Sequence, residues 1–410
     1  MGICIDRTKL QGINYIVGDE DTLANMPQVS PRRRFDEEVI EFLDLLSKKL
    51  MADKSSRAYP DIVTLSFWMR KASVKNLAKD YPEKEGIVPK GRGLLFHIAP
   101  SNVPVNYMYS LVTGLLSGNA NVVKIPSKDF DQLPIINKAV QAALDDMPSM
   151  KPYIVLVRYG HEKDINDALS QHADGRIVWG GDNTIATLRE SELPPRAVEV
   201  AFADRYSLAI IQADEYLKAD KKAAIANGFY NDTYLTDQNA CTSPRIVIWT
   251  GEKIADAKKA FWKELYDLTV KKYEIQPVQA VNKLTSSYLA AANWEGAKKE
   301  EMPDNLITRM DLPEVDDTTM DYRDNSGYFF EYDCKSMKEI VSLCNNTHCQ
   351  TLSYYGDSLD FSELMEEGIK GVDRIVPIGK TMDFEFIWDG YNLMETLCRI
   401  VRIERGGRND

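Results

Sequence analysis

The chain has 410 residues, of which 44% are hydrophobic and 10% aromatic, with 50 lysines and arginines against 62 aspartates and glutamates. This length exceeds what one hydrophobic core usually supports and predicts two domains or more, and the composition excludes disordered, collagenous and coiled-coil proteins. The net charge of -12 argues against nucleic acid or an anionic membrane as the main partner. The sequence contains no run of 18 apolar residues, so we predict no membrane span.

The six cysteines are spread along the whole chain, from Cys4 to Cys398. This spacing is typical of reduced thiols rather than of a disulfide framework. The first residues also lack the apolar segment of a signal peptide, so we expect a cytoplasmic protein. The cysteines between Cys334 and Cys349 lack the paired spacing of a zinc site, and we predict no metal.

The first 90 residues are polar and rich in helical patterns, with an amphipathic stretch at Phe35–Leu50. From Gly91 onward, short β-rich runs alternate with helical patterns, which is typical of βαβ units and a mostly parallel sheet. The strands predicted here are Gly93–Ile98, Val122–Ile125, Tyr153–Arg158 and Arg176–Trp179. The predicted helices are Pro104–Ser117, Leu133–Asp146, Lys163–His172 and Asn183–Glu190.

A second block of the same kind begins after Ala201. Its predicted strands are Ser207–Gln212, Arg245–Trp249, Tyr328–Tyr332, Gln350–Tyr355 and Arg374–Ile378. Its predicted helices are Tyr216–Tyr230 and Lys253–Lys272. We predict that the acidic segment Glu300–Asp324 is a surface loop. The alternating segment Leu397–Glu404 is predicted as a strand, either an ordinary edge strand or one that pairs with another subunit.

The segment Gly93–Lys128 has the pattern of a strand, a turn, a helix and a second strand. The predicted turn is Pro100–Pro104, and its second proline suits the first turn of a helix, where no N–H is needed. Lys124 and Ser127 lie at the carboxyl end of the second strand, which is where open α/β sheets bind ligands. A lysine and a hydroxyl there suit a ribose or a phosphate. The alternative is a surface lysine, with Asn102 serving only to form the turn.

Two further segments carry residues suited to chemistry. Gly180 and Gly181 separate a predicted strand from a predicted helix and form a second candidate turn facing a phosphate. Cys241 lies in the polar loop Asp237–Arg245 rather than in an apolar run. Polar surroundings and a nearby arginine favour the thiolate, which is the nucleophilic form. A buried structural thiol is the alternative interpretation.

The order and separation of these segments resemble the aldehyde dehydrogenase superfamily and, within it, the LuxC-type acyl-CoA reductases of bacterial luminescence systems. The segments that carry the resemblance are Ala99–Pro104, Gly118–Ser127, Asp237–Arg245 and Trp388–Gly390. The resemblance implies an α/β fold with a helical N-terminal segment and two Rossmann-like domains, each with a mostly parallel sheet. The expected domains are 1–200 for the N-terminal helices and dinucleotide binding, 201–371 for the nucleophile, and 372–410 for a C-terminal return with a candidate oligomerisation strand. We expect the active site in the crevice between the first two.

The same resemblance implies roles for individual residues. Cys241 is implied to form an acyl thioester, and Asn102, together with the Cys241 N–H, to hold the thioester oxygen. The implied cofactor-binding residues are Lys124, at the adenosine ribose, and Pro100, Ser127, Gly180, Gly181 and Glu331.

Three positions depart from the usual family pattern or match it only weakly. Glu199 stands for the hydrolytic glutamate, but the glycines that usually follow it are replaced by Ala201 and Phe202. Glu331 is the weaker counterpart of the glutamate that touches the nicotinamide ribose. Ser127 stands where many NAD-dependent members carry an acid, and a cation follows it, so we expect NADPH rather than NADH.

The resemblance therefore predicts NADPH-dependent reduction of an activated fatty acyl group to a fatty aldehyde through a Cys241 thioester. The acyl group is expected to arrive as acyl-CoA or from an acyl-carrying synthetase subunit, and the enzyme to be a homo-oligomer with no nucleic-acid partner. Two enzymatic alternatives are an NAD(P)-dependent aldehyde dehydrogenase and a reductase of another activated carboxylate. A non-catalytic subunit of an acyl-transfer complex is an alternative of a different class.

Overall fold

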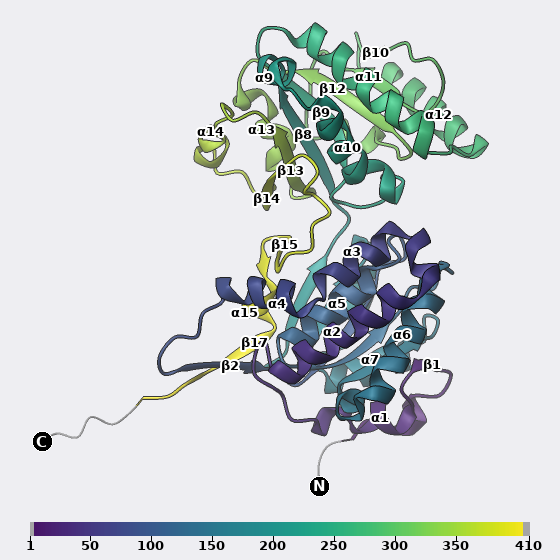
Figure 1. Ribbon diagram of the computed structural model, residues 1–410, viewed down its shortest axis with the longest axis vertical. Helices are drawn as coiled ribbons and strands as arrows, with labels where there is room; N and C mark the ends of the chain where they lie inside the picture. Colours follow the sequence, from purple (N-terminus) through teal and green to yellow (C-terminus); the bar gives the residue numbers. More distant parts are fainter. Residues whose placement is uncertain (1–3, 405–410) are drawn as a thin grey trace, which may run out of the picture. The chain divides into compact units, whose positions relative to one another are not determined.

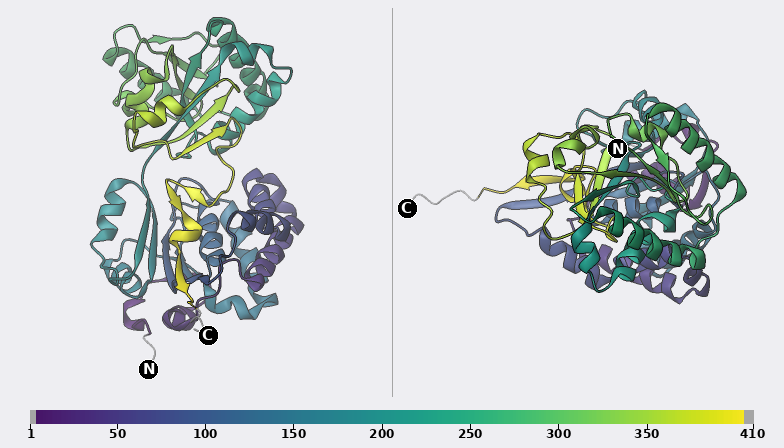
Figure 2. Two further views of the ribbon diagram at one scale, coloured as in Figure 1. Left: turned by 90° about the vertical axis from the view of Figure 1, so that its left-hand side faces the viewer. Right: turned by 90° about the horizontal axis from the view of Figure 1, so that it is seen from above.

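The computed structural model describes residues 4–404, which form two compact units (Figures 1 and 2). Unit 1 runs to Ala203 and resumes at Phe384, whereas unit 2 is Asp204–Asp383. The first predicted boundary, at residue 200, lies next to this division, and the second, at 371, lies within unit 2. Residues 1–3 and 405–410, at the two ends of the predicted domains, lie outside the described residues.

Unit 1 contains a six-stranded sheet with the strand order β1-β5-β4-β3-β6-β7. Its strands are β1 Asn14–Val17, β3 Leu94–Ile98, β4 Ala120–Lys124, β5 Ile154–Arg158, β6 Gly175–Trp179 and β7 Val198–Phe202. Neighbouring strands are parallel except β1, which is antiparallel to β5. Every residue of β3 is buried, as expected for a parallel strand covered on both faces. The predicted parallel sheet is confirmed.

The helices of unit 1 surround this sheet. They are α1 Glu20–Asn25, α2 Glu37–Ala52, α3 Pro60–Trp68, α4 Lys71–Leu77, α5 Asn106–Leu116, α6 Gln132–Asp146, α7 Lys163–His172, α8 Asp182–Arg189 and α15 Leu393–Thr396. Helix α2 begins after Asp36, whose carboxylate accepts the Glu38 N–H and caps the helix. It then packs against α3 and α6 (Figure 1).

A separate two-stranded ribbon joins distant parts of unit 1. Strand β2 (Ile87–Gly91) pairs antiparallel with β17 (Cys398–Arg402), so the chain's last described strand lies beside a strand from its first hundred residues (Figure 2). The strand predicted at Leu397–Glu404 is confirmed, and its partner within the described residues is β2 of the same chain.

The Trp388–Gly390 motif is the turn of a small hairpin. Strand β15 (Ile387–Trp388) pairs with β16 (Tyr391–Asn392), and the two residues between them both have positive φ, 49° at Asp389 and 73° at Gly390. An Asp-Gly pair with this backbone is typical of a two-residue hairpin turn. Trp388 is buried, and its ring centroid lies 5.6 Å from that of Tyr109. The motif thus packs the returning chain onto unit 1.

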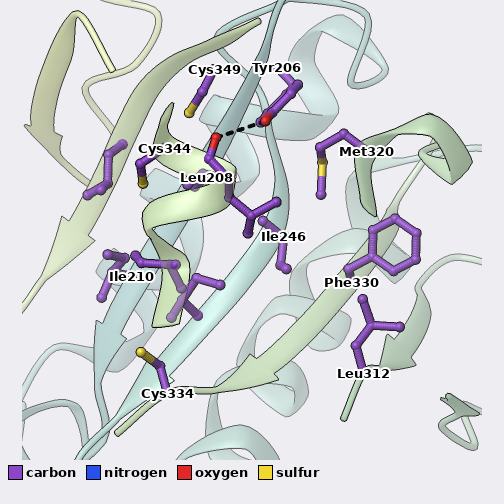
Figure 3. Close-up of a cluster of buried hydrophobic side chains, with 14 of the residues drawn as sticks. Tyr206, Leu208, Ile210, Ile246, Leu312, Met320, Phe330, Cys334, Cys344 and Cys349 are labelled. Atoms are coloured by element: carbon purple, nitrogen blue, oxygen red, sulfur yellow. Dashed lines mark hydrogen bonds between the residues drawn. The ribbon is translucent and has the colours of Figure 1, made fainter. Parts of the chain in front are cut away.

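Unit 2 contains a seven-stranded sheet with the order β10-β11-β12-β9-β8-β13-β14. Its strands are β8 Tyr206–Gln212, β9 Pro244–Thr250, β10 Lys298–Lys299, β11 Thr308–Asp311, β12 Tyr328–Asp333, β13 Cys349–Tyr355 and β14 Arg374–Pro377. All pairs are parallel except β10 with β11. Successive side chains of β8 point to opposite faces of the sheet. Leu208 and Ile210 lie in the hydrophobic cluster of Figure 3, and Ala209 and Ile211 lie in a second cluster.

The helices of unit 2 cover the two faces of this sheet. They are α9 Ala213–Lys218, α10 Lys222–Thr233, α11 Ile254–Lys272, α12 Pro277–Asn293, α13 Val341–Asn345 and α14 Ser362–Glu366. Two predictions were wrong here. The expected helix Tyr216–Tyr230 is interrupted at Ala219, where the backbone is extended, so that α9 and α10 pack separately. The expected loop Glu300–Asp324 contains β11, which pairs with β10 and β12 at the edge of the sheet.

None of the helices within residues 4–404 combines the length and the apolar character that a membrane span requires.

Candidate active site

Cys241 lies in unit 2, in the loop that leads from α10 to the amino end of β9. Asp237 and Gln238 in this loop have left-handed backbones, with φ of 52° and 57°, which is uncommon for residues other than glycine. Hydrogen bonds to Asp237 come from the hydroxyl of Tyr273 and from the side chain of Gln279, the latter at 2.7 Å. The loop therefore holds an uncommon backbone conformation through contacts with α12 and with the segment before it.

The buried side chain of Gln238 joins both ends of this loop to the neighbouring strand. Its amide nitrogen donates to the carbonyls of Pro244 (2.9 Å) and Tyr328 (3.0 Å). Its oxygen accepts the N–H groups of Gly327 (2.8 Å) and Tyr328 (3.1 Å). All the hydrogen-bonding capacity of this side chain is used within the protein, so the loop that carries Cys241 is rigidly attached to the sheet.

Burial distinguishes Cys241 from most of the other cysteines. Cys334, Cys344, Cys349 and Cys398 are buried, whereas Cys241 is partly exposed and Cys4 is exposed. Desolvation raises the pKa of Cys334 to about 11 and that of Cys398 to about 12, which keeps these thiols protonated and poorly reactive near neutral pH. Cys241 is therefore more exposed than these four buried cysteines.

Side chains from two neighbouring strands contact Cys241. The side-chain nitrogen of Gln350, at the start of β13, donates to the Cys241 sulfur at 3.4 Å. The Ser207 hydroxyl on β8 donates to the Cys241 carbonyl at 2.8 Å. Sequence reasoning missed Gln350, because it stands at the beginning of an apolar strand with no motif around it, and its proximity to Cys241 exists only in the folded sheet.

Arg245 follows Cys241 closely in the sequence and is almost completely buried. Its guanidinium donates to the Asp324 carbonyl at 2.8 Å and to the side chain of Asn325. Desolvation lowers its pKa to about 10, and the charge of Arg323 acts in the same direction, whereas Cys241 acts against them. The arginine that the sequence placed near the thiol is thus close to it and remains a cation at neutral pH.

In unit 1, the candidate cofactor residues gather at one edge of the sheet. From β3 the chain passes to β4 and β5 on one side, and it then returns to β6 on the other side of β3. The carboxyl ends of β3 and β6 therefore flank a topological switch point, where open α/β sheets bind ligands. Pro100 and the exposed Asn102 follow β3, and Gly180 and Gly181 follow β6. The structure brings these two predicted turns together at the same edge.

Lys124 ends the neighbouring strand β4. Its ammonium donates to the Gly160 carbonyl and lies 4.0 Å from the ring centroid of Tyr159. Desolvation lowers the pKa of Lys124, and Glu162 acts in the opposite direction. Ser127 follows on the exposed surface. A partly buried cation and an exposed hydroxyl thus stand at the carboxyl edge, as the sequence predicted.

The glycine turn after β6 is open on one side only. A Cβ atom added to Gly181 would meet no atom within 4 Å, whereas one added to Gly180 would lie 3.0 Å from Thr184 at the start of α8. The turn is therefore open toward solvent at Gly181 and closed against its own helix at Gly180. An open glycine at a helix start, beside the switch point, is what a bound phosphate requires.

Glu199 lies on β7, opposite Arg176 of β6 in the parallel register. One carboxylate oxygen accepts from Arg176, with its Nε at 2.9 Å, and the other accepts from Nε of Arg189 at 2.7 Å. Burial opposes its ionisation, but the hydrogen bonds from Arg189 and Arg176 outweigh burial and lower the pKa of Glu199. A carboxylate held by two guanidinium groups is a weak base, and the catalytic role of Glu199 stays a prediction.

Glu331 lies on β12 and is fully buried in unit 2. One oxygen accepts the indole N–H groups of Trp249 (2.9 Å) and Trp262 (2.7 Å), and the other accepts from Nε of Arg309 (2.7 Å). Burial raises the pKa of Glu331, against the charges of Arg309 and Lys258. No part of this carboxylate reaches the surface. Glu331 is therefore part of a core ion pair and is not exposed to a ribose.

The buried histidine of unit 1, His97, is a core residue. His97 contacts the Ser110 hydroxyl (2.7 Å) and the Asn121 side chain (3.0 Å), and desolvation lowers its pKa to about 4. Within residues 4–404, no group of three or more histidine, cysteine, aspartate or glutamate side chains is arranged to hold a metal ion.

The fold with its two parallel sheets is that of an aldehyde dehydrogenase. The aldehyde dehydrogenase 21 of Physcomitrella patens, solved with succinate, matches with a TM-score of 0.62, 13% identity, and coverage of 93% of this chain and 88% of that one. An NAD-dependent benzaldehyde dehydrogenase from Corynebacterium glutamicum matches with a TM-score of 0.57, 14% identity, and coverage of 90% and 83%. The predicted fold class is confirmed.

Within this fold, the chain belongs to the acyl-CoA reductase (LuxC) family, whose model matches residues 48–288. The long-chain acyl-protein thioester reductase of Aliivibrio fischeri is 25% identical over 333 residues, which cover 77% of this chain. The match spans 64% of the length of that relative. The resemblance stated from the sequence is thus confirmed.

Proposed function

We propose that this protein reduces an activated long-chain acyl group to an aldehyde through an acyl thioester on Cys241. The observation that carries the proposal is the partly exposed residue Cys241, which lies on a rigid loop and whose sulfur accepts a hydrogen bond from an amide. A thiol with access to substrate and a hydrogen-bond donor at the sulfur is suited to nucleophilic catalysis. Membership of the acyl-CoA reductase family indicates which acyl chemistry such a thiol performs.

The proposed reaction has two stages at the sulfur. The Cys241 thiolate attacks the carbonyl carbon of the acyl thioester, and the thiolate of the donor leaves with its electron pair. When bound, a reduced nicotinamide supplies the hydride that reduces the acyl-enzyme. The hemithioacetal formed in this way carries an oxyanion, whose electron pair re-forms the carbonyl as the C–S bond breaks toward sulfur, and the aldehyde leaves while Cys241 returns to the thiolate.

Asn102 is proposed to donate its side-chain amide to the acyl oxygen, where negative charge develops in both stages. One such donor typically contributes about 3–4 kcal/mol to lowering the barrier. The assignment rests on the match of the Ala99–Pro104 segment to the family and on the position of Asn102 on an exposed loop after β3.

We propose that unit 1 binds the dinucleotide and that unit 2 carries the acyl group. The support for the first role is the switch-point edge with Pro100, Lys124, Ser127, Gly180 and Gly181. Ser127 and Lys128 are both exposed there, and a hydroxyl next to a cation suits the 2′-phosphate of NADPH better than an acid would. Because Glu331 is enclosed in the core, we do not include it in the proposed cofactor site.

The surroundings of Glu199 support reduction rather than oxidation to an acid. Oxidation requires a base that activates water against the thioester. The two guanidinium groups on Glu199 hold it as a weakly basic carboxylate. An acyl-enzyme without an effective base survives hydrolysis long enough to be reduced.

The acyl donor is proposed to be a thioester, either acyl-CoA or an acyl group on a synthetase subunit. The Aliivibrio fischeri relative is named for an acyl-protein thioester, and the family is named for acyl-CoA. The two donors share the thioester carbonyl that Cys241 attacks and differ only in the leaving thiol. We also propose that the enzyme acts as a homo-oligomer.

Mass spectrometry of the intact protein tests this proposal. After mixing with tetradecanoyl-CoA without nucleotide, the wild-type protein should gain one acyl group, and Cys241→Ala should gain none. Adding NADPH should remove the acyl group and release the aldehyde. A wild-type protein that remains unacylated by acyl-CoA and by an acylated synthetase would show that the proposed function is wrong.

A further inference from the structure

The sheet of unit 2 is irregular at the two positions beside Cys241. Between β8 and β13, Tyr206 pairs with Cys349 and Ser207 with Thr351, so Gln350 is an extra residue in the register. Such a β-bulge re-aims the side chain it carries, and bulges are frequent next to active sites. The bulge turns the Gln350 side chain toward Cys241, with its nitrogen 3.4 Å from the sulfur.

A second irregularity occurs on the other side of β8. Ser207 pairs with Pro244 and Leu208 with Ile246, which leaves Arg245 as the extra residue. Both bulges lie at the amino edge of the sheet, one on each neighbour of the strand that holds the Cys241 carbonyl through Ser207. The local geometry around the thiol is therefore set by the register of three strands.

Hydrogen bonds to backbone carbonyl groups hold the strand around the Gln350 bulge in place. The Cys349 carbonyl accepts the Val372 N–H at 3.0 Å and a guanidinium N–H of Arg205. The Gln350 carbonyl accepts the Asp373 N–H at 2.8 Å. With its backbone held and its side chain completely buried, Gln350 is held in the orientation that faces the sulfur.

We propose that Gln350 is a catalytic residue whose side-chain amide stabilises the Cys241 thiolate. An N–H donor is more strongly attracted to an anionic acceptor than to a neutral one. The contact therefore favours the thiolate before attack, weakens while the sulfur is esterified, and strengthens again when the C–S bond of the hemithioacetal breaks toward sulfur. A neutral amide does this without placing a further charge in the buried edge of the sheet.

This inference rests on the proposed function for its catalytic meaning, but its test needs neither acyl donor nor nucleotide. The rate of iodoacetamide alkylation at Cys241 is measured against pH by peptide mass spectrometry, with the exposed Cys4 of the same protein as the reference thiol. In Gln350→Met, which keeps the volume and loses the donor, the midpoint of the Cys241 profile should move up by about one pH unit. In Gln350→Glu, which places an anion at the sulfur, it should move up further.

Ser353→Ala provides the matched control, because Ser353 is a buried polar residue of the same strand that donates to the Leu208 carbonyl. Its Cys241 profile should equal that of the wild type, and the Cys4 profile should be the same in all four proteins. If Gln350 has only a structural role, the midpoint of the Cys241 profile should not rise in order from the wild type through Gln350→Met to Gln350→Glu. A Gln350→Met profile that coincides with the wild type would overturn the inference. If Gln350→Glu does not fold, the isosteric Gln350→Met decides.

The two proposals fail in different ways. Absence of an acyl adduct on the wild-type protein removes the reductase function and leaves the alkylation profiles to decide the role of Gln350. An acyl adduct together with unchanged profiles in the Gln350 variants keeps the reductase function and removes Gln350 from it.

Discussion

The two units have similar parallel sheets but carry their candidate chemistry at opposite edges. In unit 1, the residues assigned to the cofactor follow the carboxyl ends of β3, β4 and β6. In unit 2, Cys241 and Gln350 lie at the amino ends of β9 and β13. The same architecture thus presents two chemically different surfaces.

The difference follows from what each edge offers. At the carboxyl edge of unit 1, strands run into turns and helix starts, where backbone N–H groups suit a phosphate. At the amino edge of unit 2, a long anchored loop and two β-bulges fix the directions in which side chains point. The carboxyl edge of unit 1 is thus suited to binding an anionic cofactor, and the amino edge of unit 2 is suited to orienting a nucleophilic side chain.

Replacing Asn102 gives the largest effect expected at the edge of unit 1. Asn102→Ala should lower kcat for aldehyde formation by about 100-fold, because one donor to the developing oxyanion is lost. Acylation of Cys241 should still be detectable by intact mass, only more slowly. Ser101→Ala, a change at the exposed neighbour in the same loop, should stay within about twofold of the wild type. An Asn102→Ala enzyme with the wild-type rate contradicts the oxyanion role.

The two units should also respond to pH with opposite signs. Burial lowers the pKa of His97 in unit 1 from 6.5 to about 4. The unfolded state therefore takes up the proton first, and the unfolding free energy of unit 1 should fall as the pH drops from about 6.5 to about 4, by about 3 kcal/mol in total. Burial raises the pKa of Asp232 in unit 2 from 3.8 to about 7, against N–H groups of Gly379 and Thr381.

For Asp232, the unfolded state releases the proton first. The unfolding free energy of unit 2 should therefore fall as the pH rises from about 4 to about 7, by about 4 kcal/mol. Hydrogen exchange of amides in each unit, corrected for the intrinsic pH dependence of exchange, measures both trends. His97→Gln and Asp232→Asn should each flatten the trend of their own unit. A common trend in both units that neither variant changes contradicts this assignment.

The nucleotide preference probes the carboxyl edge with a smaller effect. Lys128→Glu places an anion beside Ser127, so kcat/KM with NADPH should fall by about tenfold relative to kcat/KM with NADH. The measurement is the ratio of the two values for each protein. Lys138→Glu makes the same charge change at an exposed position of α6 and should leave the ratio unchanged. An unaltered ratio in Lys128→Glu means that the cation does not face the 2′-phosphate.

Glu199→Gln is expected to have the smallest effect on the reaction. Because both oxygens of Glu199 are engaged by guanidinium groups, aldehyde formation should stay within about twofold of the wild type. Loss of the ion pair with buried Arg176 should lower the unfolding free energy by about 3 kcal/mol, measured by urea titration. A tenfold drop in aldehyde formation, with the fold intact, would instead give Glu199 the catalytic role that the family pattern implies.

Elements with regular apolar spacing were predictable, and α12 shows the limit of that reasoning. The strand β3 and the helix α7 have the usual patterns and were predicted at or near their observed bounds. Helix α12 buries Lys283, Ser287 and Ala290 toward unit 2 and exposes apolar residues such as Val281 and Tyr288. The side chains on its buried face are small or polar. The spacing of its apolar residues therefore does not indicate which face of the helix packs against the rest of the protein.

The candidate site divides in the same way. Cys241, Asn102 and Lys124 lie in local patterns of turn, strand end and polar loop that can be read along the chain. The surroundings of Glu199 and Glu331 depend on guanidinium and indole groups of other elements, between 10 and 82 residues away in the sequence. Such partners meet only when the sheet forms, and local residue patterns do not reveal them.

By itself, the sequence indicated the alternation of strands and helices, the parallel sheets and the family, and it singled out Cys241 as the candidate nucleophile. These features depend on residues close together along the chain, whose spacing sets the backbone directly. The tertiary structure alone decided which carboxylates are engaged by buried cations and which amide reaches the Cys241 sulfur. Those outcomes depend on strand register, where one extra residue redirects a side chain.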